Sequence, residues 1–279
     1  FLEHNVLLRR FTLSVGVLAN YNSALNEGIH FYPGIDASYR IGDNFRLYGS
    51  WNRALRMPTF TDLYYEGKTN KGNPDLKPEE SEAFEVGLKY NTYFLRAHIA
   101  GFYRKGKNMI DWVKEKPEDI WESQNLTKVD NLGFETNLSL LPRELGNERF
   151  FIRKIELGYA FIHQDKDSEG YISNYALDYL KHKFTAQLSH SIWKGFSATW
   201  YVRWQDRAGS YTKYENLKPA YEEPYAPYCL VDMKVNWEYQ RLNLYAELNN
   251  LLNSTYYDLG NIPQPGIWFK AGFRYSFKY

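Results

Sequence analysis

Apolar and polar residues alternate along most of the chain with a period of two residues. This is the period of a β-strand with one apolar face and one polar face. In the last segment, Ile267 to Tyr279, every second residue is apolar. About 13 such segments of roughly 9 to 14 residues can be counted, so the sequence predicts an all-β, antiparallel fold. Other clear segments are 84–90, 134–140, 184–189, 196–205, 231–238 and 242–248.

The connections between these segments alternate between short and long. Strict alternation puts every long connection at one end of an up-and-down sheet, as in a transmembrane β-barrel. A sandwich with Greek-key crossovers would not produce it so regularly. The sequence therefore predicts an antiparallel up-and-down transmembrane β-barrel with long extracellular loops. The short connections lie near 9–10, 42–43, 91–92, 142–148, 193–194 and 239–240, and the long ones at 22–28, 56–80, 114–126, 164–179, 206–226 and 253–265.

The apolar side of each strand is expected to face lipid and the polar side to face the lumen. About 13 strands are neither an even number nor a closed set. We therefore interpret 1–279 as one domain, the C-terminal portion of a larger barrel, with segments 1–8 and 267–279 at two open edges. Residues expected outside include Leu88, Trp200, Val235, Leu244, Phe273 and Tyr275, and those expected inside include Glu85, Lys234, Glu247, Lys270 and Arg274.

Composition narrows the class of protein. Eight Trp, 25 Tyr and 17 Phe make 18% of the chain aromatic, which favours β structure with aromatic rings near a surface. The 34 basic and 33 acidic residues nearly cancel, unlike the charge of a nucleic-acid-binding protein. No apolar run approaches the roughly 18 residues of a spanning helix. The single Cys229 excludes an intrachain disulfide and a Cys-based zinc cluster.

Two motifs resemble the signature of TonB-dependent outer-membrane receptors. The first leaves a strand at Arg56 through an Arg-x-Pro-x-Phe-like element and enters the next through Gly-Asn-Pro-x-Leu-Lys-Pro-Glu at 72–79. The second is Asn-Leu-hydrophobic-Asn at 250–253, before the last hairpin. Prolines and turn residues dominate both, so their role is interpreted as chiefly structural. The motif residues are Pro58, Phe60, Leu63, Tyr64, Gly72, Asn73, Pro74, Leu76, Pro78, Glu79, Asn250, Leu251 and Asn253.

The resemblance implies the last dozen or so strands of a 22-stranded barrel. It also implies a plug domain and a TonB-pairing box, which this sequence lacks, so TonB would be engaged through the missing N-terminal region. The complete protein would lie in the bacterial outer membrane and import a scarce nutrient. Segments 57–65 and 260–266 are most similar to cobalamin (vitamin B12) receptors of the Bacteroidetes type. Cobalamin or a related corrinoid is therefore the expected ligand and a surface lipoprotein a further candidate partner, while a ferric siderophore or haem stays open as an alternative.

Aromatic residues crowd the predicted long loops. Their rings could stack on a flat organic ligand such as a corrin, with hydroxyl groups available for hydrogen bonds. The alternative is an interfacial girdle or packing between loops. The ligand-binding candidates are Tyr64, Tyr65, Trp121, Tyr211, Tyr214, Tyr221, Tyr225, Tyr256 and Tyr257.

The segment 165–170 begins like an EF-hand loop, with Asp165, Asp167 and Glu169 as oxygen ligands. Ala176 stands where an EF-hand has its bidentate Glu, so only a flexible carboxylate site for calcium remains open there. No other cofactor is expected. No enzyme motif is found, and no catalytic residue is predicted. An outer-membrane barrel enzyme and a passive porin are the alternatives from other classes.

Overall fold

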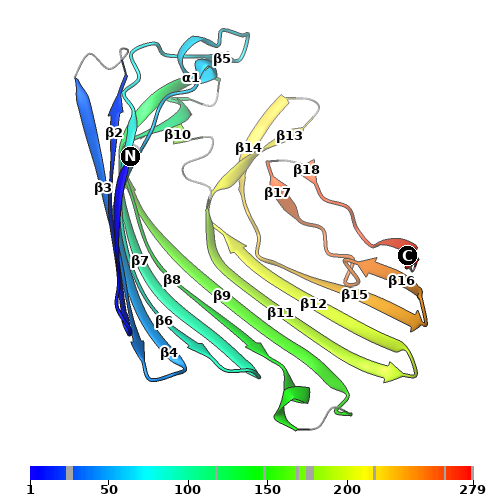
Figure 1. Ribbon diagram of the computed structural model, residues 1–279. Coiled ribbons are helices and arrows are strands. Elements are labelled where there is room, and N and C mark those ends of the chain that lie inside the picture. The colour runs from blue at the N-terminus through cyan, green and yellow to red at the C-terminus, as the bar shows by residue number, and fades with distance from the viewer. Residues whose placement is uncertain are drawn as a thin grey trace. The chain divides into compact units, whose positions relative to one another are not determined.

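The computed structural model describes residues 1–22, 28–116, 118–146, 149–167, 170–173, 179–215, 218–260 and 262–277. Nearly all regular structure in these residues is β-strand, as predicted (Figure 1). One antiparallel sheet follows the order β1-β2-β3-β4-β6-β7-β8-β9-β11-β12-β15-β16-β19, so its strands pair with their neighbours in sequence. This up-and-down order confirms the predicted sheet. It also puts the first and last predicted strands, β1 (Leu2–Leu7) and β19 (Trp268–Tyr275), at the two ends of the order.

The chain forms two compact units, and the strands β6, β7, β8 and β9 each contribute residues to both. Unit 1 comprises 1–89, 99–134 and 162–179, and unit 2 comprises 90–98, 135–161 and 180–279. The remaining strands of the main sheet are β2 (Phe11–Tyr21), β3 (Ile29–Ile41), β4 (Phe45–Arg56), β6 (Glu79–Asn91), β7 (Leu95–Lys114), β8 (Trp121–Leu140), β9 (Ile152–Asp167), β11 (Leu180–Trp193), β12 (Phe196–Arg207), β15 (Tyr228–Tyr239) and β16 (Leu242–Asn249).

The predicted long connections contain regular structure of their own. Two of them form small antiparallel hairpins, β13-β14 and β17-β18. None of the helices in the described residues is long and apolar enough to cross a membrane. These additional elements are α1 (Phe60–Tyr64), β5 (Asn70–Lys71), the 3-10 helix η2 (Pro142–Leu145), β10 (Ile172–Ser173), β13 (Ser210–Glu215), β14 (Lys218–Pro224), β17 (Tyr257–Leu259) and β18 (Ile262–Pro263).

Three strands are longer than the sequence predicted. β7 and β8 each have 20 residues and β9 has 16. Because β8 already begins at Trp121, the connection predicted at 114–126 shrinks to 115–120. The connection at 141–151, which was predicted to be short, is longer than the one at 115–120. The alternation of connection lengths is therefore less strict than predicted. Strand pairing continues into these predicted loops because β5 and β10 give their backbone groups partners.

The register of unit 2 sorts apolar and polar side chains onto opposite faces. Residues directly opposite one another on paired strands share a face. Leu244 and Phe273 are 41% and 74% exposed, so no second sheet of the described chain packs on the apolar face and the sandwich is excluded. One apolar row is Leu188, Trp200, Met233, Leu248 and Phe269, and the adjacent polar row is Ser189, Thr199, Lys234, Glu247 and Lys270.

On the polar face of each unit, ion pairs and ring contacts connect neighbouring strands. In unit 2, Glu247 lies 2.7 Å from the Lys234 ammonium and 2.5 Å from that of Lys270. In unit 1, the Tyr48 hydroxyl donates to Glu85 at 2.7 Å, and Lys89 lies over the Tyr48 ring. The predicted assignment of apolar and polar residues to the two faces is confirmed at these positions.

Candidate ligand-binding site

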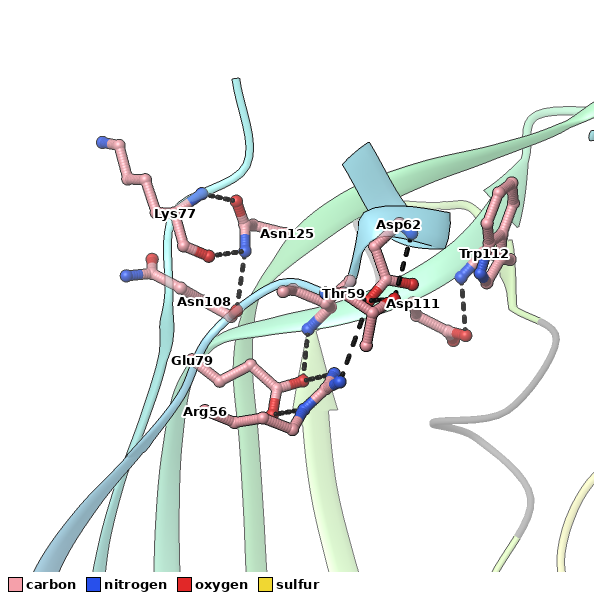
Figure 2. A network of polar contacts seen from close by, with 10 residues as sticks. Arg56, Thr59, Asp62, Lys77, Glu79, Asn108, Asp111, Trp112 and Asn125 are labelled. Carbon is pink, nitrogen blue, oxygen red and sulfur yellow. Dashed lines mark hydrogen bonds and ion pairs between the residues drawn. The ribbon is translucent and has the colours of Figure 1, made fainter. Parts of the chain in front are cut away.

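The connection between β4 and β6 is closed by an ion pair at its two ends (Figure 2). Nε and Nη2 of Arg56, the last residue of β4, donate to the two carboxylate oxygens of Glu79, the first residue of β6, each at 2.6 Å. The Glu79 carboxylate also accepts from the backbone N–H of Ile110 in β7 at 2.8 Å. Glu79 is only 7% exposed. Such a bidentate pair fixes direction as well as distance, so it sets how the loop leaves the sheet.

Helix α1 sits inside this connection with its acidic residue buried. Thr59 is the N-cap, and it forms a reciprocal capping box with Asp62. Asp62 is 8% exposed and lies 3.8 Å from the guanidinium of Arg56. The aromatic side chains of α1 point away from this contact, since Phe60 is 84% and Tyr64 is 65% exposed. Their ring centroids are 6.2 Å apart, so α1 presents an aromatic pair on a fixed support.

The Gly-Asn-Pro element of the first motif packs directly on α1. The N–H of Gly72 donates to the carbonyl of Tyr65 at 2.6 Å, and that of Asn73 to the carbonyl of Asp62 at 2.9 Å. A Cβ on Gly72 would lie 2.8 Å from the backbone of Leu63, which leaves room for glycine alone. Pro74, Leu76 and Pro78 continue the connection to the start of β6. These contacts agree with a structural role, and Phe60, Tyr64 and Pro74 are the residues of this motif that are exposed.

The end of the β7-β8 hairpin next to its turn supports two long connections. The Asn125 amide accepts from the Lys77 N–H at 2.8 Å and donates to the carbonyls of Lys77 and Asn108 at 2.9 and 2.7 Å (Figure 2). Asp111, 1% exposed, accepts from the Ser173 hydroxyl of β10. A small apolar core lies beside them. It contains Val113, Leu126 and Val129, with Met109 and Tyr171 packed against it.

The aromatic candidates of unit 2 pack mainly on one another. Tyr211 and Tyr225 are 7% and 8% exposed, and Tyr211 stacks on Tyr257 with ring centroids 5.0 Å apart. Burial raises the pKa of the Tyr211 hydroxyl. Arg207 lies over the Tyr225 ring at 4.8 Å. These contacts join the β12-β15 and β16-β19 connections, so Tyr211, Tyr225 and Tyr257 act in loop packing.

The same cluster continues to the start of β15. The Tyr228 hydroxyl donates to the Asp258 carboxylate at 2.5 Å, and the Tyr228 ring lies 4.7 Å from that of Tyr256. The N–H of Gly260 donates to the Tyr225 hydroxyl at 3.0 Å. Tyr256 therefore belongs to this loop cluster as well.

Other candidates remain accessible. Tyr65, Tyr214 and Tyr221 are 50%, 54% and 48% exposed, so together with Tyr64 they keep the surface that a ligand would need. Trp121 is half-buried beneath the Lys114 ammonium, 4.5 Å from its ring centroid. Tyr64, Tyr65 and Trp121 belong to unit 1, whereas Tyr214 and Tyr221 lie on the β13-β14 hairpin of unit 2. The structure thus divides the candidates into two surfaces, and ligand binding at either stays a prediction.

Removing Tyr211 should loosen both connections of unit 2. We expect Tyr211→Ala to raise the rate of proteolytic cleavage in the 206–226 connection several-fold, because it removes a buried ring that contacts both loops. Limited proteolysis of the folded receptor in detergent measures this rate. Tyr214→Ala, on the same hairpin but 54% exposed, is the matched control and should leave it unchanged. Equal cleavage of both variants would contradict the packing role of Tyr211.

The second motif fixes the connection between β16 and β19. Asn250 is 3% exposed and adopts φ of 52°. Its backbone N–H donates to Asp232 at 2.7 Å, and its side chain bonds the backbone of Ser254 and Pro265. The N–H of Leu251 donates to the Val231 carbonyl at 2.8 Å, and Asn253 Oδ1 accepts from the Ile267 N–H at 3.0 Å. The motif therefore anchors both ends of the last long connection, which agrees with a structural role.

We expect Asn250→Ala to lower the free energy of unfolding by about 2 kcal/mol, because buried backbone groups lose their partners and alanine fits positive φ poorly. Urea titration of the refolded receptor in vesicles measures the change. Asn243→Ala removes an exposed hydrogen bond to Glu238 and should cost less than about 0.5 kcal/mol. A similar loss from both variants would argue against the anchoring role of Asn250.

The predicted calcium loop is only partly described. Asp165 forms an ion pair with Lys128 at 2.7 Å. Glu169 and the side chain of Asp167 lie outside the described residues. In the part of the chain that is described, no group of three or more His, Cys, Asp or Glu residues is placed to hold a metal ion. Calcium binding here stays a prediction.

An up-and-down antiparallel sheet with one apolar and one polar face, tied together by motif-bearing long loops, defines the class of outer-membrane β-barrels. Within this class the family model described as "TonB dependent receptor-like, beta-barrel" matches residues 1–251. The chain belongs to this family, which places it in the bacterial outer membrane.

Two curated relatives differ in their named ligands. The vitamin B12 transporter BtuB of Vibrio vulnificus is 26% identical over 218 residues, covering 58% of this chain and 35% of that protein. The ferrienterobactin receptor of Escherichia coli is 22% identical over 295 residues, covering 95% of this chain and 38% of that protein. This chain thus spans between about a third and two fifths of these relatives.

Solved structures share the fold. The ferric enterobactin receptor of Pseudomonas aeruginosa, in complex with enterobactin, superposes with a TM-score of 0.75 at 20% identity, over 99% of this chain and 44% of that chain. The copper transporter OprC gives a TM-score of 0.73 at 16% identity, over 99% of this chain and 46% of that chain. The predicted resemblance to TonB-dependent receptors is therefore confirmed at the level of fold and family.

Proposed function

We propose that the protein containing this chain is an outer-membrane receptor that binds cobalamin or a related corrinoid and imports it with energy supplied through TonB. The observation that carries the choice of ligand is sequence similarity to the vitamin B12 transporters BtuB of Vibrio vulnificus and Photobacterium profundum, which are 26% and 25% identical to this chain. Two exposed aromatic surfaces support it, Tyr64 with Tyr65 in unit 1 and Tyr214 with Tyr221 in unit 2, because flat apolar ligands bind well to aromatic side chains.

The proposed transport needs no covalent chemistry by this chain. Ligand must bind tightly from outside and be released inside, so two conformations with different affinity are required. We assign the change between them to the plug and to TonB, and the extracellular ligand surface partly to this chain. The contacts of Arg56 with Glu79 in unit 1 and of Asn250 with Asp232 in unit 2 would keep the connections of their own units in place during the change.

A ferric siderophore or haem is the second candidate cargo. The ferrienterobactin receptor aligns with 95% of this chain, more than the 58% aligned with the B12 transporter of Vibrio vulnificus, although at lower identity. Each of the two aromatic surfaces also suits a catecholate siderophore, since the rings of such a ligand are flat and partly apolar. This alternative differs from the first in its ligand and not in its mechanism.

Uptake by intact cells distinguishes the two cargoes. We expect deletion of the gene to abolish accumulation of labelled cobalamin at nanomolar external concentration and to leave uptake from a panel of ferric siderophores and haem unchanged. Complementation with the full-length gene should restore cobalamin uptake. Unchanged cobalamin uptake together with loss of one iron source would replace the corrinoid proposal by the siderophore or haem alternative. Loss of neither would reject both.

A further inference from the structure

The apolar face of unit 1 contains a groove of about 670 Å³. Its floor is formed where small residues, Ala37, Gly49 and Gly101, occupy positions that carry large side chains elsewhere on this face. Its walls are large and apolar, and several are substantially exposed, including Phe84 at 44%, Val86 at 58% and Leu132 at 56%. The wall residues are Ile35, Trp51, Phe84, Val86, Tyr103 and Leu132.

The groove lies on the lipid-facing side of the sheet. Ala37 pairs with Gly49, whereas the neighbouring pair Asp36 and Ser50 points to the opposite, polar face. Phe84 and Val86 alternate in the same way with Glu85, which binds Tyr48 on the polar face. Because the chain is an outer-membrane barrel, the apolar face is covered by hydrocarbon, and the groove is continuous with that face.

Two aromatic residues at one end of the groove, Trp51 and Tyr103, form hydrogen bonds through their polar atoms. The Trp51 indole N–H donates to Glu82 at 2.8 Å, and the Tyr103 hydroxyl donates to Asp130 at 3.0 Å. Trp and Tyr with an apolar body and a polar tip are typical of the membrane–water interface. Both carboxylates lie on the side of the long β4-β6 connection, because Glu82 is near the start of β6 and Asp130 lies between Leu132 and the start of β8, where β8 pairs with β5 of that connection. The groove therefore runs from the outer interface into the hydrocarbon.

We infer that this groove is a binding site for one acyl chain of an outer-leaflet lipid, which remains bound to the receptor when bulk lipid exchanges. A groove that is concave and apolar contacts more of an acyl chain than a convex barrel wall does, so dispersion and burial favour its occupation. The lipid would stiffen strands β4, β6 and β7 beneath the α1 loop.

The test fills the groove from its floor and from its wall. Gly101→Leu is suitable because a Cβ there meets only the Gly133 carbonyl, at 3.9 Å, so the backbone need not move. Val86→Phe fills the groove from an exposed wall position without changing a glycine. Ala271→Leu, an exposed small residue on the apolar face of unit 2, is the matched control for added bulk. The full-length receptor is purified from outer membranes in mild detergent, and heat-modifiable migration selects folded protein.

Native mass spectrometry then counts the lipids retained by each protein. We expect the wild type and Ala271→Leu to retain one lipid per receptor through detergent exchange, and both Gly101→Leu and Val86→Phe to retain at least fivefold less. Retention by the groove variants equal to that of wild type, or no retained lipid in the wild type, would overturn the inference. If Gly101→Leu fails to fold, Val86→Phe against Ala271→Leu decides the result alone.

Discussion

Arg56→Met should lower the free energy of unfolding of the full-length receptor by about 2 to 3 kcal/mol. The substitution keeps the length of the side chain but leaves the Glu79 carboxylate, 7% exposed, without its cation. Breaking one side of a buried ion pair costs about 3 to 5 kcal/mol. We expect a smaller loss than this because the Arg56 side chain is half-exposed, so solvent already screens part of the interaction. Urea titration in vesicles measures the change.

Arg53 provides the matched control for Arg56. It lies three residues earlier on β4, and its guanidinium is 3.5 Å from Glu80, but the Glu80 side chain is 37% exposed whereas that of Glu79 is 9% exposed. Surface pairs of this kind contribute about 0 to 1 kcal/mol. Arg53→Met should therefore change the free energy of unfolding by less than about 1 kcal/mol. If the two variants lose the same stability, the Arg56–Glu79 pair does not hold the loop as proposed.

The alternation of apolar and polar residues along the chain predicts most of the sheet, because in a barrel one face of each strand contacts lipid and the other faces the polar lumen. Lys234, Glu247 and Lys270 form one polar row, and their sequence neighbours form the apolar row beside it. The lengths of β7 and β8 could not be predicted in this way. The parts of β7 and β8 next to the turn between them pack on other connections, so Asp111 and Val113 become buried for reasons that depend on distant segments such as β10.

The candidate site was predictable only in part for the same reason. The motif identifies Glu79, Gly72 and Asn250 correctly as positions where the backbone needs support. Asn125, which bonds three backbone groups of other segments, carries no local signal, because its partners are at positions 77 and 108. A pattern of Tyr in predicted loops also does not separate the buried Tyr211 from the exposed Tyr214. That difference arises from packing between two connections.

The exposed aromatic pair on α1 leads to a prediction about ligand binding. Helix α1 buries Asp62 and exposes Phe60 and Tyr64, the reverse of what burial of apolar surface would favour. Such a pair is stable in this position because the capping box and Arg56 hold the helix from its polar side. Rigidly held aromatic residues are typical of binding hot spots, since little conformational entropy is lost when they are covered.

We expect the double variant Phe60→Ala/Tyr64→Ala to raise the Kd of the full-length receptor for cobalamin at least tenfold, which corresponds to about 1.4 kcal/mol. Binding of labelled cobalamin to purified receptor in detergent measures it. Tyr93→Ala removes an aromatic side chain of similar exposure, 71%, from the short connection between β6 and β7, and should leave the Kd unchanged. An unchanged Kd in the double variant, with folding intact, would reassign Phe60 and Tyr64 to contacts with another part of the protein and would leave Tyr65, Tyr214 and Tyr221 as the aromatic ligand contacts to test.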